Sequence, residues 1–106
     1  MKKDNFSVNK LDEVNNDLQA IVDYYNEQKH KLGNEFFAVA LKQMKRLKND
    51  FLLYEVKYQS VRCVSIGGFP YQIHYTINEN DKTVLIIAII GMSQNPNTNW
   101  GKRNII

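Results

Sequence analysis

The sequence predicts an α+β domain in which an N-terminal helical hairpin packs on a small twisted antiparallel β-sheet, in the order β-α-α-β-β-β. Two observations support this fold class. Apolar residues recur at three- and four-residue steps up to about residue 50, and later segments follow the two-residue period of strands. The length of 106 residues, with 43% hydrophobic and 24% charged residues, suits one hydrophobic core. We therefore expect residues 1–106 to form a single domain.

The first half of the chain contains one strand pattern and two helical patterns. Residues 5–8 are a candidate edge strand, and Asn9 followed by Asp12 resembles a helix cap. The first helical stripe comprises Leu11, Val14, Leu18, Ile21, Val22 and Tyr25. We expect Gly33 to end this helix and Asn34 to cap the next one. The second stripe comprises Phe36, Phe37, Ala40, Leu41, Met44 and Leu47. So short a connection implies an antiparallel helical hairpin.

The second half has the composition of an antiparallel meander. Its three strand patterns are residues 61–66, 71–77 and 83–90. Turns are expected at Gly67-Gly68 and at residues 78–81. Residues 84–90 are apolar at every position, which predicts an interior strand buried on both faces.

Few residues carry the chemistry of an enzyme or a cofactor site. Cys63, His30 and His74 are the only Cys and His residues, and they lack the spacing of metal ligands, so we expect no metal. No Gly-rich phosphate loop or nucleophile elbow occurs, so we expect no cofactor and no catalytic residue. A Cys63–His74 pair across adjacent strands is conceivable, but Cys63 is better interpreted as a small buried hydrophobe in a reducing compartment.

The charges are unevenly distributed along a chain of net charge +3. Acidic residues concentrate at 12–27 and basic residues at 42–48, which predicts that exposed ion pairs join the two helices, each worth at most about 1 kcal/mol. The basic run could also contact nucleic acid, but no aromatic residues are interleaved with it as stacking platforms, which favours a solvated helix face. The run 84–90 is too short to cross a membrane, and the polar start of the chain predicts a cytoplasmic location.

One strand offers a candidate docking face. Gln72, His74, Thr76 and Asn78 share one side of their strand; if the other side packs on the helices, this side is open. The position of Arg62, in the preceding strand, depends on the turn. A three-residue loop would place Arg62 beside His74, and a two-residue loop would place it opposite Ile73, towards the core.

Five segments, taken in chain order, resemble a known family. They are residues 17–25, 32–36, 58–62, 69–75 and 95–100. Together they resemble the landmarks of the RelE/ParE superfamily of type II toxins and match its ParE-like, plasmid stabilisation branch best. The resemblance implies a growth-inhibiting toxin that is silenced by a cognate antitoxin protein, with DNA gyrase as its target. For the oligomeric state, a homodimer and a toxin–antitoxin hetero-oligomer are both compatible with the resemblance.

Two departures from the superfamily pattern bear on activity. Many ParE-like relatives carry a His and Arg residues before the late Pro, whereas residues 91–95 here read GMSQN. The resemblance places the messenger-RNA-cleaving arginines of the RelE branch at Gln72 and near Ser93, and the nearest late aromatic residue is Trp100 rather than a Tyr. Cleavage needs groups that stabilise negative charge and protonate a leaving oxygen, so we expect no ribonuclease activity. An mRNA interferase and a non-toxic binding module are the alternative functions.

Arg62, Gln72, His74 and Trp100 are the candidate target-binding residues. Arg62 is a charge within a run of strand formers, and its planar donors suit a carboxylate or phosphate on a partner. Trp100 can anchor an interface or cap the core.

Overall fold

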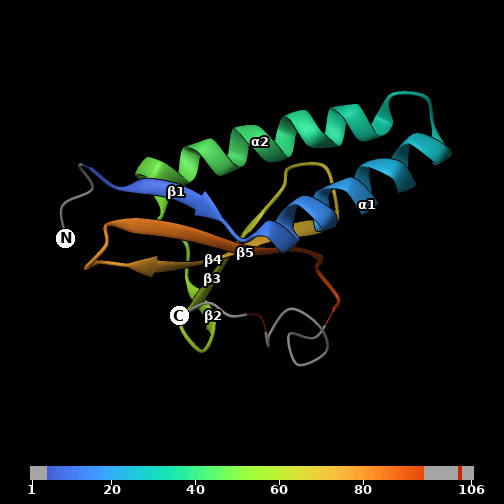
Figure 1. Cartoon of the computed structure of the whole chain (residues 1–106). Coiled ribbons are helices and arrows are strands. Elements are labelled where there is room, and N and C mark those ends of the chain that lie inside the picture. Colours follow the sequence, from blue (N-terminus) through green and yellow to red (C-terminus); the bar gives the residue numbers. More distant parts are fainter. Residues whose placement is uncertain (1–4, 95–102, 104–106) are drawn as a thin grey trace.

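The computed structural model describes residues 5–94 and Arg103, and in it two antiparallel helices lie over one face of a five-stranded sheet (Figure 1). The elements in chain order are β1 (Ser7–Lys10), α1 (Asp12–Gln28), α2 (Leu32–Asp50), β2 (Val56–Tyr58), β3 (Val61–Ser65), β4 (Tyr71–Asn78) and β5 (Thr83–Gly91). The predicted α+β class and helical hairpin are confirmed. The three-residue strand β2 was not predicted, because so short a segment shows no hydrophobic periodicity.

The strands lie in the order β1-β5-β4-β3-β2. Strands β2 to β5 form the predicted antiparallel meander. Strand β1 instead pairs with β5 in parallel, with Ser7 opposite Thr83 and Lys10 opposite Ile86. Parallel pairing needs a long crossover connection, and the intervening hairpin and strands supply it. Strand β5 is therefore an interior strand, as predicted.

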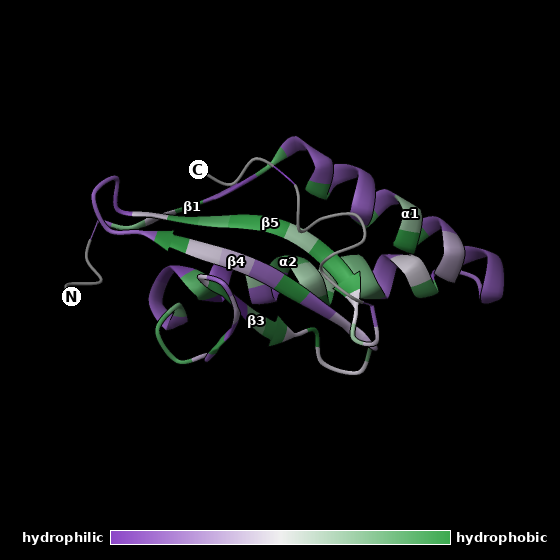
Figure 2. Ribbon diagram, turned by 90° about the horizontal axis from the view of Figure 1, so that it is seen from below, coloured by the Kyte–Doolittle hydropathy of each residue, from purple (hydrophilic) through white to green (hydrophobic). Residues whose placement is uncertain are grey.

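A β-bulge in β5 divides its apolar residues between the two faces of the sheet. Tyr75 of β4 lies opposite Ile86, but the next residue, His74, lies opposite Ala88, so Ile87 is an extra residue. Before the bulge Ile86 packs in the core under the helices, and after it Ile89 does. A second apolar cluster on the other side, called here the far face, comprises Val61, Cys63, Ile87, Ala88 and Ile90. Figure 2 looks onto the far face, where β5 is hydrophobic over most of its length.

The predicted helix boundaries are wrong at three positions. Asn9 lies in β1 and does not cap α1, whose N-cap is Leu11 without a side-chain bond. Asn34 lies inside the first turn of α2, which begins at Leu32. Gly33 lies within the same turn, where a Cβ would collide with the carbonyl oxygen of Val22 in α1. Gly33 is thus needed where the helices approach each other closely, rather than as a helix end.

The two predicted helical stripes form the helix side of the core, with one exception. Val14, Leu18, Ile21, Phe36, Ala40, Met44 and Leu47 are buried there. Phe37 was placed on the same stripe but is 40% exposed. Neither helix is long and apolar enough to cross a membrane.

Candidate functional site

Arg62 lies opposite Tyr75 on the helix side of the sheet, so neither of the two expected registers is observed. Residues 66–70 connect β3 and β4, closed by a bond from the Ile66 N–H to the Tyr71 carbonyl. One guanidinium nitrogen of Arg62 donates to the Tyr54 carbonyl at 2.5 Å. The Tyr75 hydroxyl donates to the carbonyl of Phe51 at 2.7 Å.

These two bonds tie residues 51–54, which follow α2, to the middle of the sheet. Burial is the main reason that the pKa of the Tyr75 hydroxyl is raised, so this group stays protonated and keeps donating. Arg62 therefore has a structural task that its sequence position did not reveal. Its role in target binding stays a prediction.

His74 lies on the far face and is buried, with only 6% of its surface exposed. Its Nδ1 is 2.9 Å from the Tyr58 hydroxyl and 3.5 Å from Sγ of Cys63. Burial lowers the pKa of His74 to about 4, against a weaker opposing effect of Asp17. The imidazole is therefore neutral at physiological pH, and its nearest polar neighbours hold it in place.

The cysteine beside His74 is equally unreactive. Cys63 lies opposite His74 in the β3–β4 ladder. Burial raises the pKa of its thiol to about 11, although Lys57 acts in the opposite direction. A nucleophilic pair needs a thiolate, and this environment suppresses it. The structure thus brings the two residues together but supports the interpretation of Cys63 as a small buried side chain.

The expectation of an open docking face on β4 is wrong for its middle. His74 and Thr76 are both buried, and the far face carries an apolar cluster. Gln72 is half-buried opposite Ser65 and lines a shallow groove of about 490 Å³ that also includes Lys57. Gln72 and His74 therefore share one face of the sheet, and Arg62 lies on the other.

Trp100 lies outside the described residues. Within residues 5–94 and Arg103, no three His, Cys, Asp or Glu side chains converge as metal ligands.

An ion pair that the sequence analysis did not anticipate joins α1 to the C-terminal part of the chain. The two terminal guanidinium nitrogens of Arg103 donate to the Asp17 carboxylate, at 2.8 and 2.9 Å. Arg103 also donates to the Ile87 carbonyl at 2.8 Å, and the Ile89 N–H donates to Asp17 at 3.1 Å. The Asp17 and Arg103 side chains are only 12% and 15% exposed. The bonds to Asp17 are the main cause that raises the pKa of Arg103, so it stays charged.

This ion pair covers part of the edge of β5 that no strand pairs with among the described elements. Strand β1 ends at Lys10, opposite Ile86, so the edge of β5 beyond that point has no neighbouring strand among the described elements. Asp17 and Arg103 satisfy two of its main-chain groups there. A signal was present in the sequence: Asp17 falls between Val14 and Ile21 on the apolar stripe, at three- and four-residue steps, and a carboxylate in such a position needs a cation.

The fold and these contacts define a small α+β domain in which Arg62, His74 and the Asp17–Arg103 pair are held by bonds within the chain. A solved structure described as the chromosomal ParDE TA system from P. aeruginosa shares this fold with a TM-score of 0.74. It is 17% identical, and the match covers 83% of this chain and 97% of that chain. A search of curated proteins finds no match.

The family comparison is more specific than the fold. The family described as the ParE toxin of the type II toxin–antitoxin system, parDE, matches residues 10–96. The chain therefore belongs to the ParE toxin family. The resemblance identified from the sequence is confirmed.

Proposed function

We propose that this protein is the toxin of a type II toxin–antitoxin pair, that it inhibits growth by binding DNA gyrase, and that a cognate antitoxin neutralises it in the cytoplasm. Membership of the ParE toxin family carries the proposal. The solved relative, described as a ParDE TA system, supports an antitoxin as the partner.

The polar groups favour binding over catalysis. His74 is neutral, the thiol of Cys63 is protonated, and the guanidinium of Arg62 donates to a main-chain carbonyl. None of these groups is poised to donate a proton or to stabilise a developing negative charge, as RNA cleavage requires. We therefore expect no cleavage of messenger RNA on translating ribosomes.

The test is controlled expression in a bacterial host, alone and together with the product of the adjacent reading frame. The proposal predicts growth arrest with a DNA-damage response, relief on co-expression, and inhibition of purified gyrase in a supercoiling assay. Codon-specific messenger RNA cuts would assign the protein to the interferases instead. A folded protein that binds its partner without arresting growth would be a non-toxic binding module.

A further inference from the structure

Strand β2 is one edge of the sheet, and its outer side has no neighbouring strand among the described elements. The hydrogen bonds of the β3–β4 ladder determine which main-chain groups of this edge face outwards. The Ile66 N–H donates to the Tyr71 carbonyl. Every second residue of β3 faces the same neighbour, so Arg62 also directs its N–H and C=O towards β4. Val56 lies opposite Arg62, so the N–H and C=O of Val56 point away from β3, towards the outer edge.

The segment around this edge also exposes apolar side chains. Val56 is 49% exposed and Leu53 is 67% exposed. Leu53, Glu55 and Lys57 line the groove of about 490 Å³ that also contains Gln72, called here the Gln72 groove. A free main-chain edge beside exposed apolar side chains is a surface to which another strand can add.

The charges of this edge make it complementary to itself. Glu55 and Lys57 flank Val56, both are exposed, and the Lys57 Nζ lies 3.9 Å from a carboxylate oxygen of Glu55. Two copies paired antiparallel, with Val56 opposite Val56, would place the Glu55 of each copy opposite the Lys57 of the other. A register with Lys57 opposite Lys57 would bring like charges together. The outward main-chain groups of Val56 meet in the first register, so charge and hydrogen bonding favour the same pairing.

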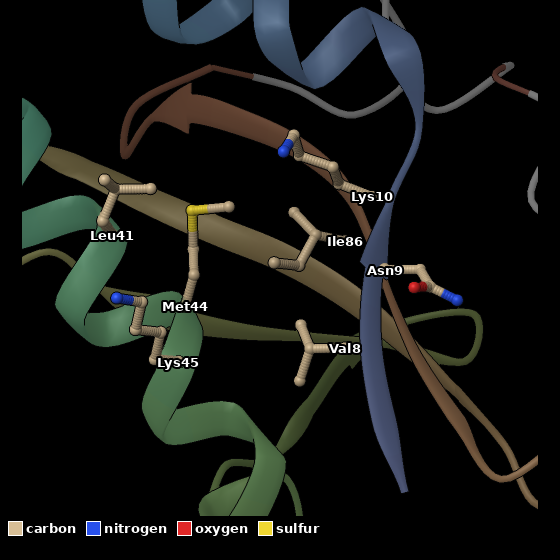
Figure 3. A pocket seen from close by; sticks show the side chains of 7 residues that line it. All are labelled: Val8, Asn9, Lys10, Leu41, Met44, Lys45 and Ile86. Carbon is tan, nitrogen blue, oxygen red and sulfur yellow. The ribbon is translucent and has the colours of Figure 1, made fainter.

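The opposite edge of the sheet lacks this self-complementarity. Strand β1, of which Figure 3 labels Val8, Asn9 and Lys10, has Lys10 as its single charged residue. Two copies of β1 paired antiparallel would therefore have no opposite charges to bring together. Among the described edge strands, β2 is thus the one suited to a second copy of the chain.

We propose that β2 is the contact surface of a homodimer, in which two copies pair antiparallel about a two-fold axis at Val56. Two main-chain hydrogen bonds join the Val56 residues, and two ion pairs join the Glu55 of each copy to the Lys57 of the other. The pairing joins two five-stranded sheets into one and brings the Gln72 groove of each copy to the dimer axis. Because β2 is only three residues long, the interface is small and the dimer exchanges with the monomer. This dimer goes beyond the proposed function, since it needs no antitoxin and no target.

Sedimentation velocity of the purified full chain over a range of concentrations measures the dissociation constant of the dimer. Glu55→Lys and Lys57→Glu each replace both ion pairs by like-charge contacts, and each should weaken dimerisation at least about tenfold. The swapped double variant Glu55→Lys/Lys57→Glu restores opposite charges across the axis. It should dimerise within about threefold of the wild type.

The matched controls are Glu79→Lys and Lys42→Glu. They make the same changes in net charge at exposed positions outside β2 and the Gln72 groove. Each should leave the dissociation constant within about threefold of the wild-type value.

A mixing experiment separates specific pairing from a general effect of charge. The Glu55→Lys variant has lysines at both 55 and 57, and the Lys57→Glu variant has glutamates at both. Each variant alone should be largely monomeric, whereas an equimolar mixture should form a heterodimer, because both contacts across the axis are then between opposite charges. Native mass spectrometry distinguishes the heterodimer from either homodimer by mass.

Selective weakening by the single variants, recovery in the swapped variant and a heterodimer in the mixture support the β2 dimer. Wild-type protein that stays monomeric at its highest soluble concentration overturns it. A wild-type dimer that the β2 variants weaken no more than the controls do has its interface elsewhere, and this result also overturns the proposal. Neither negative result affects the proposed toxin function.

Discussion

Removing the Asp17 carboxylate should destabilise the protein more than any other single change to an acidic residue of α1. Asp17→Ala deletes two bonds to Arg103 and one to the Ile89 N–H. Arg103 would then keep its bond to the Ile87 carbonyl but lose its counter-ion in a site where its side chain is 15% exposed. The edge of β5 would also lose a main-chain partner.

The expected loss of stability can be estimated from the burial of the Asp17–Arg103 ion pair. Breaking a fully buried ion pair by removing one partner costs about 3–5 kcal/mol. Because both side chains keep a small exposed fraction, we expect a loss of about 3 kcal/mol for Asp17→Ala, which corresponds to a fall in Tm of roughly 12–20 °C for a domain of this size. Asp17→Asn keeps an acceptor for the Ile89 N–H and should cost less, about 2 kcal/mol.

Urea unfolding measures the free energy of unfolding of each variant, and a double-mutant cycle isolates the interaction between Asp17 and Arg103. Asp17→Ala, Arg103→Ala and the double variant should yield a coupling energy of about 2 kcal/mol. Asp23→Ala is the control, an exposed acidic residue of the same helix, expected to change stability by less than about 0.5 kcal/mol. Equal losses for Asp17→Ala and Asp23→Ala would refute the structural importance of this ion pair.

Three further predictions follow from single residues. The pKa of His74 is about 4 in the folded chain, against the ordinary value of 6.5, so the unfolded chain binds more protons between these values. The free energy of unfolding should therefore fall by roughly 2–3 kcal/mol as the pH drops through this window. Urea unfolding at neutral and acidic pH measures this loss. A His74→Gln variant whose free energy of unfolding depends on pH as strongly as that of the wild type would contradict the prediction. Arg62→Ala should cost about 1–2 kcal/mol through the lost bond to the Tyr54 carbonyl; an unchanged Tm together with loss of toxicity would instead place Arg62 at the target. Gly33→Ala should lower stability by about 2 kcal/mol despite the better helix propensity of alanine, because its Cβ would meet the Val22 carbonyl; a thermal melt at or above that of the wild type would show that the helices can separate to admit it.

The sequence predicts the helices and strands of this fold better than it predicts which side chains lie on which face of the sheet. The periods of three and four, and the apolar run ending at Ile90, place the hairpin and the interior strand correctly because burial follows those periods. The bulge at Ile87 could not be predicted, since an extra residue in an all-apolar run changes no pattern. That bulge determines which side chains of β5 reach the far face, and the apolar cluster on this face accompanies the burial of His74. The register of Arg62 likewise depends on a five-residue connection whose bonds are main-chain.

The distribution of charge connects the structure of the chain to its partner. The sequence analysis expected the acidic residues of α1 to pair with the basic run of α2, but within the described residues no ion pair joins the two helices. Asp17 pairs instead with Arg103 at the edge of β5. Lys45 consequently remains exposed and lines a hollow between α2 and β1 together with Lys10, without an acidic residue in that lining. Because both lysines line the hollow and no acidic residue does, a carboxylate supplied by another chain would complement them. Binding of the antitoxin product should therefore weaken as salt is raised, and Lys10→Glu/Lys45→Glu should reduce that salt dependence more than the control Lys29→Glu/Arg46→Glu, at two exposed positions outside the hollow.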